Sequence, residues 1–198
     1  MEDLVAVILA GGQSTRFGSD KLHYRLNNKE LLLHVYEVVS SVLPCVYLIG
    51  KKDSSNSSTA TLHWIEDEIK DLGPIGGLYT AMVKIPARNY FICAGDMPFI
   101  QPGMLHLLVN SHQQSLNITV AKSSRGLEPL FAVYNSSNQK LIVEQIQKKE
   151  FSLHKLFVKA AIKVVNFDIH GYISQVFFNI NSTSDVKNAE KIKQNSYR

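Results

Sequence analysis

Short apolar runs rich in β-branched residues recur along the chain, and the segments between them have helical spacing. The runs occupy residues 5–9, 45–49, 90–94, 118–121 and 161–165. Runs that are apolar at nearly every position are typical of strands buried on both faces, as in a parallel sheet covered by helices. The pattern therefore predicts a mostly parallel sheet with helices between its strands.

The clearest helical pattern lies in residues 29–43, where apolar side chains recur every three or four residues and Pro44 follows. The same reasoning predicts helices at residues 76–84, 103–112, 138–148, 152–158 and 184–194, the last capped by Ser182, Thr183 or Ser184. Alternating strands and helices predict an α/β protein with a three-layer α/β/α Rossmann-like fold. No Pro/Gly/Ser-rich linker divides the sequence, so we expect a single domain over residues 1–198.

Composition changes this picture little. The chain is 45% hydrophobic and 19% charged, and its apolar runs are far shorter than the roughly 18 residues of a membrane span, so we expect no membrane partner. Met1-Glu2-Asp3 lacks the basic start of a signal peptide, which predicts a cytoplasmic location. Cys45 and Cys93 have no His or Cys at ligand spacing, so we expect two buried, reduced thiols.

The net charge of +4 raises the question of nucleic acid binding. The lysines are scattered along the sequence, however, and no face combining aromatic and basic residues is visible. We therefore expect no nucleic acid partner and attribute the charge to anionic small-molecule substrates.

The segment after the first predicted strand combines glycines with cations. Gly11 and Gly12 lack Cβ atoms, so the main chain can turn with positive φ and bring its N–H groups close to a phosphate. Arg16 adds a planar fork of donors and Lys21 a compact ammonium. The spacing matches neither a P-loop nor a Gly-x-Gly-x-x-Gly fingerprint. The segment indicates a nucleoside triphosphate site, although glycine-rich turns also occur for packing alone.

Asp96 follows the predicted strand at 90–94 and precedes Pro98. Ligands of open parallel sheets bind outside the carboxyl ends of the strands, and there we expect the Asp96 carboxylate to face solvent. A lone carboxylate suits Mg2+, which takes one or two protein oxygens and completes its shell with water and phosphate. The alternative is that Asp96 caps a turn or a helix.

Asp67 and the glycine-rich residues 73–77 form a second candidate loop. The double glycine Gly76-Gly77 could bring backbone against a flat base, and Asp67 could accept from a guanine N–H or orient the ribose. The loop could equally be the start of a helix, with Pro74 and the glycines as punctuation. Asp71 is a competing carboxylate.

These motifs resemble those of molybdenum cofactor guanylyltransferases, which have a Rossmann-like nucleotidyltransferase fold. The glycine-rich segment at residues 9–21 also resembles the broader nucleotidyltransferase signature Leu-Ala-Gly-Gly-x-Ser-x-Arg-x-Gly-x-Asp-Lys. The matching motifs span roughly residues 4–190 and are Leu9-Ala10-Gly11-Gly12, Asp67, Gly73-Pro74-Ile75-Gly76-Gly77, Gly95-Asp96-Met97-Pro98-Phe99, Glu128-Pro129-Leu130-Phe131-Ala132-Val133-Tyr134 and Phe178-Asn179-Ile180-Asn181.

The resemblance implies transfer of GMP from GTP to the terminal phosphate of Mo-molybdopterin, with release of pyrophosphate. It implies Mg2+ held by Asp96, catalytic roles for Lys21, Arg16 and Asp96, and contacts of Asn179 and Asn181 with the acceptor. Transient contacts with proteins that insert or deliver the molybdenum cofactor are also implied. The implied GTP-binding residues are Leu9, Ala10, Gly11, Gly12, Lys21, Asp67 and Asp96.

The sequence departs from the family pattern in two places. After the second predicted strand the family often has an asparagine that holds the nucleoside, whereas this chain has Ile49-Gly50. The family's Asn-Ile-Asn-Thr-Pro-Glu-Asp is here Asn-Ile-Asn-Ser-Thr-Ser-Asp, at residues 179–185. The alternatives are cytidylyl transfer to molybdopterin, nucleotidyl transfer to a sugar or polyol phosphate, and a non-catalytic nucleotide-binding module.

Overall fold

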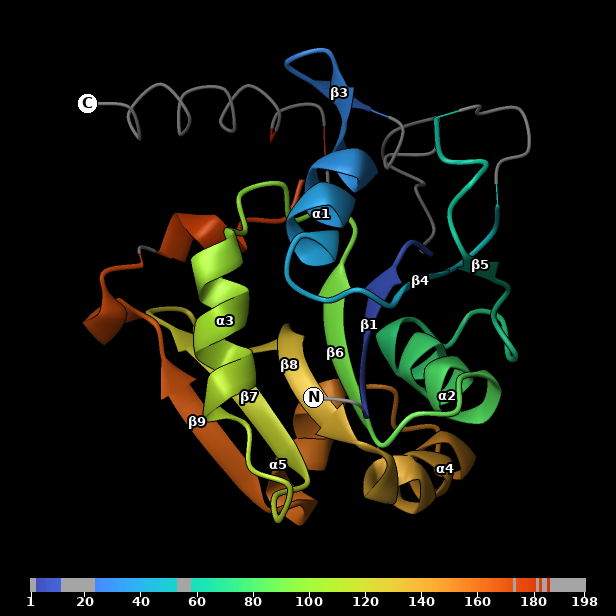
Figure 1. Cartoon of the computed structure of the whole chain (residues 1–198). Coiled ribbons are helices and arrows are strands. Elements are labelled where there is room, and N and C mark those ends of the chain that lie inside the picture. Colours follow the sequence, from blue (N-terminus) through green and yellow to red (C-terminus); the bar gives the residue numbers. More distant parts are fainter. Residues whose placement is uncertain are drawn as a thin grey trace.

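The structure is a computed structural model that describes residues 3–11, 24–52, 58–172, 174–180, 182 and 185. Within them, seven strands form one sheet in the order β5-β4-β1-β6-β8-β7-β9 (Figure 1). The strands of this sheet are β1 (Leu4–Leu9), β4 (Val46–Ile49), β5 (Trp64–Ile65), β6 (Asn89–Ala94), β7 (Ile118–Ser123), β8 (Gly126–Asn135) and β9 (Ile162–Asn166). A separate antiparallel hairpin joins β2 (Arg25–Leu26) and β3 (Lys29–Glu30).

The sheet is mostly parallel, as the sequence predicts. Strand β1 pairs in parallel with β4 and β6, β4 with β5, and β7 with β9. The exception is β8, an unpredicted strand that runs antiparallel to both β6 and β7. Its pairing with β7 passes from Val120–Ala132 to Ala121–Glu128 and so skips Pro129, which has no N–H to donate.

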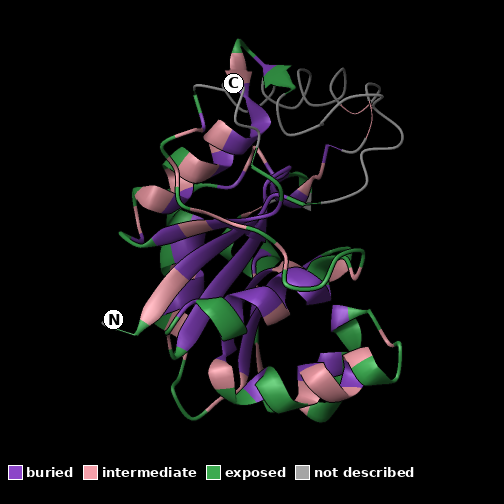
Figure 2. Ribbon diagram, turned by 90° about the vertical axis from the view of Figure 1, so that its right-hand side faces the viewer, coloured by how far each residue is buried: buried purple, intermediate pink, exposed green. Residues whose placement is uncertain are grey.

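Helices cover both faces of the sheet. One buried cluster joins α1 (Leu31–Ser40) and α3 (Pro102–Ser111) to one face. A second joins α2 (Pro74–Lys84), α4 (Gln139–Gln147) and α5 (Leu156–Lys159) to the other. Figure 2 shows the buried strands between these helical layers. The three-layer α/β/α fold is therefore confirmed.

Short 3-10 helices complete the described chain: η2 (Ser136–Asn138), η3 (Leu153–Lys155), η4 (Asp168–His170) and η5 (Ser174–Phe177). The predicted helices agree with the observed ones to within a few residues, except that residues 29 and 30 belong to β3. The predicted helix at 184–194 lies outside the described residues apart from Asp185, whose N–H donates to Ser182 Oγ over 3.2 Å. That bond is the one expected of a Ser182 N-cap.

The two cysteines differ from each other. Cys93 is fully buried in β6, where burial and the nearby Asp96 carboxylate raise the pKa of its thiol. Cys45 is exposed, because β4 begins one residue after it. The expectation of a buried Cys45 is therefore wrong, while both thiols are free. Among the described residues, no helix has the length and apolar character needed to cross a membrane.

Candidate active site

The carboxyl ends of β1, β4, β5 and β6 open onto a cavity of about 690 Å³. In Figure 1 these ends point toward the top of the view, where the β2–β3 hairpin also lies. Residues far apart in the sequence therefore meet at one edge of the sheet, where open parallel sheets bind their ligands. The cavity is lined by Leu9, Gly11, Ile49, Gly50, Lys51, Glu66, Asp67, Ile69, Lys70, Asp71, Leu72, Gly73, Pro74, Gly77, Ala94, Asp96, Leu130 and Asn179.

Gly50 allows the ends of β1 and β4 to approach each other closely. Its φ is +148°, and a Cβ at this position would lie 2.8 Å from the carbonyl carbon of Ala10 and 2.8 Å from the Gly11 nitrogen. The Ala10 N–H donates to the Ile49 carbonyl over 2.7 Å. Any side chain at residue 50 would displace the backbone of the glycine-rich segment. Only main-chain atoms of Gly50 can therefore serve a ligand here.

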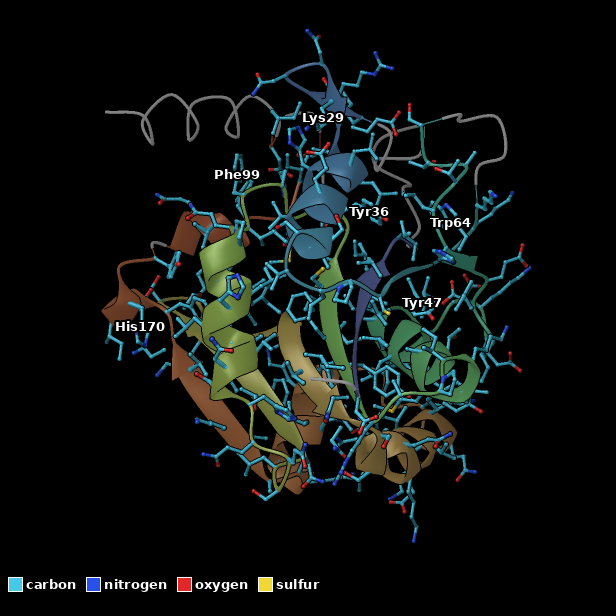
Figure 3. The ribbon with its side chains drawn as sticks, viewed as in Figure 1. Lys29, Tyr36, Tyr47, Trp64, Phe99 and His170 are labelled. Carbon is cyan, nitrogen blue, oxygen red and sulfur yellow. The ribbon has the colours of Figure 1, made fainter. Side chains whose placement is uncertain are left out.

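Asp67 follows β5, and Trp64 on that strand, labelled in Figure 3, donates from Nε1 to the Thr59 carbonyl over 3.0 Å. The Asp67 carboxylate lies close to Gly11, whose Cβ, if present, would be 3.3 Å from Asp67 Oδ2. Burial raises the pKa of Asp67, and the positive charge of Lys84 opposes part of that rise. The carboxylate thus lies beside Gly11, shortly after the end of β1, at the wall of the cavity.

Two side chains of α2 hold the loop that carries Asp67. The fully buried Thr80 accepts from the Glu68 N–H over 3.0 Å and donates to the Gly76 carbonyl over 2.8 Å. Lys84 forms an ion pair with Glu68 at 2.9 Å and donates to the Glu66 carbonyl over 3.2 Å. The loop is therefore fixed by its hydrogen bonds to a helix that packs on the sheet.

The double glycine has a packing role. Helix α2 begins at Pro74, and Gly76 and Gly77 are buried in its first turn. A Cβ at Gly77 would lie 2.7 Å from Leu9 Cδ2, so the glycine lets the helix start pack directly on β1. The alternative that this motif starts a helix is therefore correct. Gly77 also lines the cavity, so contact with a base stays a prediction.

Asp96 lies at the end of β6, beside β1, and lines the cavity. The Gly95 N–H donates to the Leu9 carbonyl over 3.0 Å, which fixes the turn in front of the carboxylate. Asp96 is only 5% exposed, so the expectation of a solvent-facing carboxylate is wrong. Residues 177–180 approach it, since the Ile180 N–H donates to the Asp96 carbonyl over 3.0 Å.

Of the predicted site residues, Leu9, Gly11, Asp67, Asp96 and Asn179 line one cavity. Ala10 is buried between Leu9 and Gly11. The remaining predicted residues, Gly12, Arg16, Lys21 and Asn181, lie outside the described residues.

Ile69 and Leu130 line the cavity without having been predicted, whereas Asp71 was named as a competing carboxylate and also lines it. Ile69 is an apolar side chain with 40% exposure, and Asp71 has a positive φ of 62°. Aspartate often adopts a positive φ and single exposed apolar residues are common, so neither property marks the loop by itself. Only the structure shows that both residues line the cavity. Leu130 enters the cavity from β8, within the residues that the register with β7 skips.

The described residues contain no cluster of three or more His, Cys, Asp and Glu side chains that could hold a metal by itself. Phosphoryl transfer from nucleoside triphosphates nevertheless ordinarily uses a divalent cation, which draws most of its ligands from phosphate and water. A single enclosed carboxylate at the cavity wall, Asp96, fits that donor requirement.

Comparison with known proteins identifies the family. Residues 6–157 match the MobA-like NTP transferase domain. The chain belongs to this family. It is 35% identical, over 93% of this chain and 96% of the relative, to a probable molybdenum cofactor guanylyltransferase of Thermococcus sibiricus. It is 32% identical, over 91% and 87%, to a protein of the same name from Aquifex aeolicus.

A solved structure extends the family likeness to the fold. Molybdopterin-guanine dinucleotide biosynthesis protein A from Archaeoglobus fulgidus superimposes with a TM-score of 0.78 and 26% identity, covering 97% of this chain and 99% of that one. The cavity at the strand ends is thus part of a MobA-like NTP transferase, and the resemblance seen in the sequence motifs is confirmed.

Proposed function

We propose that this MobA-like protein transfers GMP from GTP to the terminal phosphate of Mo-molybdopterin, giving Mo-molybdopterin guanine dinucleotide and pyrophosphate. The observation that carries the proposal is the cavity of about 690 Å³ in which Gly11, Asp67 and Asp96 meet at the strand ends. Its volume falls in the range of small-molecule sites. The family and the names of its relatives support the choice of reaction.

In this proposal GTP occupies the side of the cavity between β1 and β5. Asp67 contacts the nucleoside, since its carboxylate lies beside Gly11, and the backbone of Leu9, Ala10 and Gly11 faces the phosphates. Ile69 supplies apolar surface near the same loop. The chain has Ile49-Gly50 in place of the family's asparagine, so we propose that this contact comes from the main chain.

The reaction needs positioning and charge neutralisation rather than a protein nucleophile. An oxygen of the acceptor phosphate forms a bond to the α-phosphorus of GTP, and the bond from that phosphorus to the bridging oxygen breaks, its electron pair leaving with pyrophosphate. The attacking oxygen is already an anion, so no proton has to be removed. Lys21 and Arg16 stabilise the charge on the departing pyrophosphate.

Asp96 holds Mg2+ in this proposal. The chemistry that a bound divalent cation supplies is charge neutralisation at the phosphate oxygens. Asp96 is enclosed and lines the cavity, so its negative charge is available to the ligand side rather than to bulk water. Asn179, which lines the cavity, contacts the acceptor, and so does Asn181. We also propose a cytoplasmic location and transient contacts with proteins that insert or deliver the cofactor.

Titration calorimetry tests the nucleotide part of the proposal. The protein is titrated with GTP, CTP, ATP and UTP in turn, each with Mg2+ and again with EDTA. We expect GTP to bind selectively and its affinity to fall with EDTA. Preferential binding of CTP or UTP would overturn guanylyl transfer and favour cytidylyl transfer or nucleotidyl transfer to a sugar phosphate. If no nucleotide binds, a non-catalytic module is favoured.

The transfer itself is tested by anaerobic incubation with GTP, Mg2+ and Mo-molybdopterin, followed by chromatography of the products. Equal amounts of pyrophosphate and guanine dinucleotide are expected. Selective GTP binding without dinucleotide formation would overturn the acceptor and leave the nucleotide assignment in place.

A further inference from the structure

A hydrogen bond from the β7–β8 turn reaches the segment that carries Asn179. The Arg125 guanidinium donates to the Phe177 carbonyl over 2.7 Å, across 52 residues of sequence. Arg125 is not among the described residues that line the cavity. Its contact is with the backbone of the segment, two residues before Asn179.

Arg125 is itself held in place. Its guanidinium also donates to Glu128 Oε1 over 3.3 Å, and Ser123 Oγ donates to that same oxygen over 2.6 Å. The Arg125 N–H donates to Ser123 Oγ over 3.1 Å. The side chain therefore joins a small network across the β7–β8 turn, and this network orders it before any ligand binds.

The segment 177–180 is fixed on both sides of Asn179. Before it, Phe177 is buried against Phe131 and Phe167, with ring centroids 5.4 Å from each. After it, the Ile180 N–H donates to the Asp96 carbonyl, and its side chain is buried with Leu26 and Leu31. Phe99, labelled in Figure 3, packs against this last cluster. Arg125 is thus the charged contact on the amino-terminal side of Asn179.

We propose that Arg125 is a positioning residue for the acceptor: by holding the Phe177 carbonyl it sets where Asn179 stands in the cavity. The inference rests on the proposed function, which gives Asn179 its role. Phe177 and Ile180 stay packed when the Arg125 bond is lost, so its loss shifts the segment rather than unfolding it. Asp67 and Gly11 lie on other elements, and the Ile180 bond to Asp96 lies on the far side of Asn179 from Phe177, so GTP binding does not depend on the Arg125 bond.

Arg125→Met tests the role, with Arg125→Lys as the conservative variant and Lys155→Met as the matched control. Lys155 has a similar exposure, 51% against 47% for Arg125, and pairs with Glu150 at 2.9 Å on η3. In Arg125→Met we expect the KM for Mo-molybdopterin to rise by about ten- to a hundredfold, the scale of a misplaced substrate contact. The Kd for GTP with Mg2+ and the melting temperature stay at the wild-type values. Arg125→Lys recovers part of the loss, and Lys155→Met changes none of these quantities.

Hydrogen exchange measured by mass spectrometry gives a readout independent of turnover. We expect peptides containing Phe178 and Ile180 to exchange faster in Arg125→Met than in the wild type or in Lys155→Met. Unchanged exchange would overturn the proposal, as would an acceptor KM equal to that of Lys155→Met. If the wild type binds GTP but forms no dinucleotide, it is the proposed function that fails.

Discussion

At the scale of single residues, the enclosure of Asp96 decides how its role can be tested. A carboxylate with 5% exposure is part of the packed wall of the cavity, so truncation to alanine would leave a hole as well as remove a charge. Asparagine keeps nearly the same volume and one carbonyl oxygen while it removes the charge. The substitution therefore separates the electrostatic role from packing.

We expect Asp96→Asn to lower kcat by at least about a hundredfold, the scale of one preorganised electrostatic contact, with the melting temperature within a few degrees of the wild type. Steady-state turnover and calorimetric melting check the two parts. Asp168→Asn, an exposed position on η4, serves as the control and leaves turnover unchanged. A variant that keeps wild-type turnover and Mg2+ dependence would remove Asp96 from the proposed reaction.

The ionisation of Asp67 lowers the stability of the folded protein as pH rises. Its pKa is raised in the folded protein, mainly by burial, so folding favours the protonated form over the ionised one. Stability linked to this group is fully present below the ordinary pKa of about 3.9 and is lost as pH rises through the raised value. A partly buried carboxylate with a raised pKa at a cavity wall is typical of a functional position.

We therefore expect Asp67→Asn to remove the loss of stability that accompanies the ionisation of Asp67. The free energy of unfolding of the variant, measured by urea denaturation at a series of pH values, should gain on the wild type as pH rises from about 3.9 through the raised pKa. Other carboxylates cancel in the difference between the two proteins. A difference that is the same at every pH would contradict a raised pKa. GTP affinity of the variant should fall at neutral pH.

At the scale of elements, the cavity depends on how α2 holds the loop after β5. Thr80 is fully buried and satisfies both the Glu68 N–H and the Gly76 carbonyl, while Lys84 reaches the same loop from a partly exposed position. A buried bond is worth more than an exposed ion pair, because a lost partner leaves a desolvated polar group behind. The two contacts therefore contribute unequally.

We expect Thr80→Val to destabilise the protein by about 1–3 kcal/mol, since the Glu68 N–H loses its partner inside the structure. Lys84→Met, which breaks only exposed contacts, should cost about 0–1 kcal/mol. Urea denaturation measures both. Thr80→Val should also weaken GTP binding by calorimetry, because the loop carries Asp67. Reduced stability with unchanged GTP affinity would show that this bond supports the fold alone.

Local sequence patterns predicted the helices and the buried parallel strands, whose residues carry a regular apolar pattern. The helix at 31–40 follows from its apolar spacing, and the buried parallel strands follow from continuous apolar runs. Strand β8 was missed because Gly126 and Pro129 break the pattern, and only pairing with β6 and β7 on either side makes it a strand. The exposure of Cys45 was missed because it depends on where β4 begins.

In the candidate site, too, features with a local sequence signal were predicted and features that depend on tertiary contacts were not. The glycine-rich segment after residue 9 and Asp96 were recognisable because each follows a predicted strand, and parallel strands end at one edge. Asp67 follows β5, which was not predicted, and was recognised only with the glycine-rich residues 73–77 and by family resemblance. The burial of Asp96 was not recognisable, since it depends on tertiary packing, and one of its contacts comes from Ile180, about eighty positions later. The contact of Arg125 with Phe177 and the approach of Gly50 to Ala10 are likewise tertiary and leave no local signal.

At the scale of the whole molecule, every element around the cavity belongs to one sheet or packs on it. The central strand β1 joins β4 and β6, and the antiparallel β8 ties the parallel strands β1, β4, β5 and β6 to β7 and β9. Two buried clusters run along the two faces of this sheet. Within the described residues, no group of strands of this seven-stranded sheet therefore has a core that is separate from the rest, which favours one cooperative unit.

We expect a single thermal transition in which the calorimetric and van't Hoff enthalpies agree, as for one domain. A ligand that binds only the folded state adds about 2.7 kcal/mol at a hundred times its Kd. Saturating GTP with Mg2+ should therefore move the whole transition upward without splitting it, and the shift should be smaller in Asp96→Asn, which retains the nucleoside contacts. Two transitions, only one of them moved by GTP, would mean that the strands around the cavity unfold separately from β7 to β9, against the single domain predicted from the sequence.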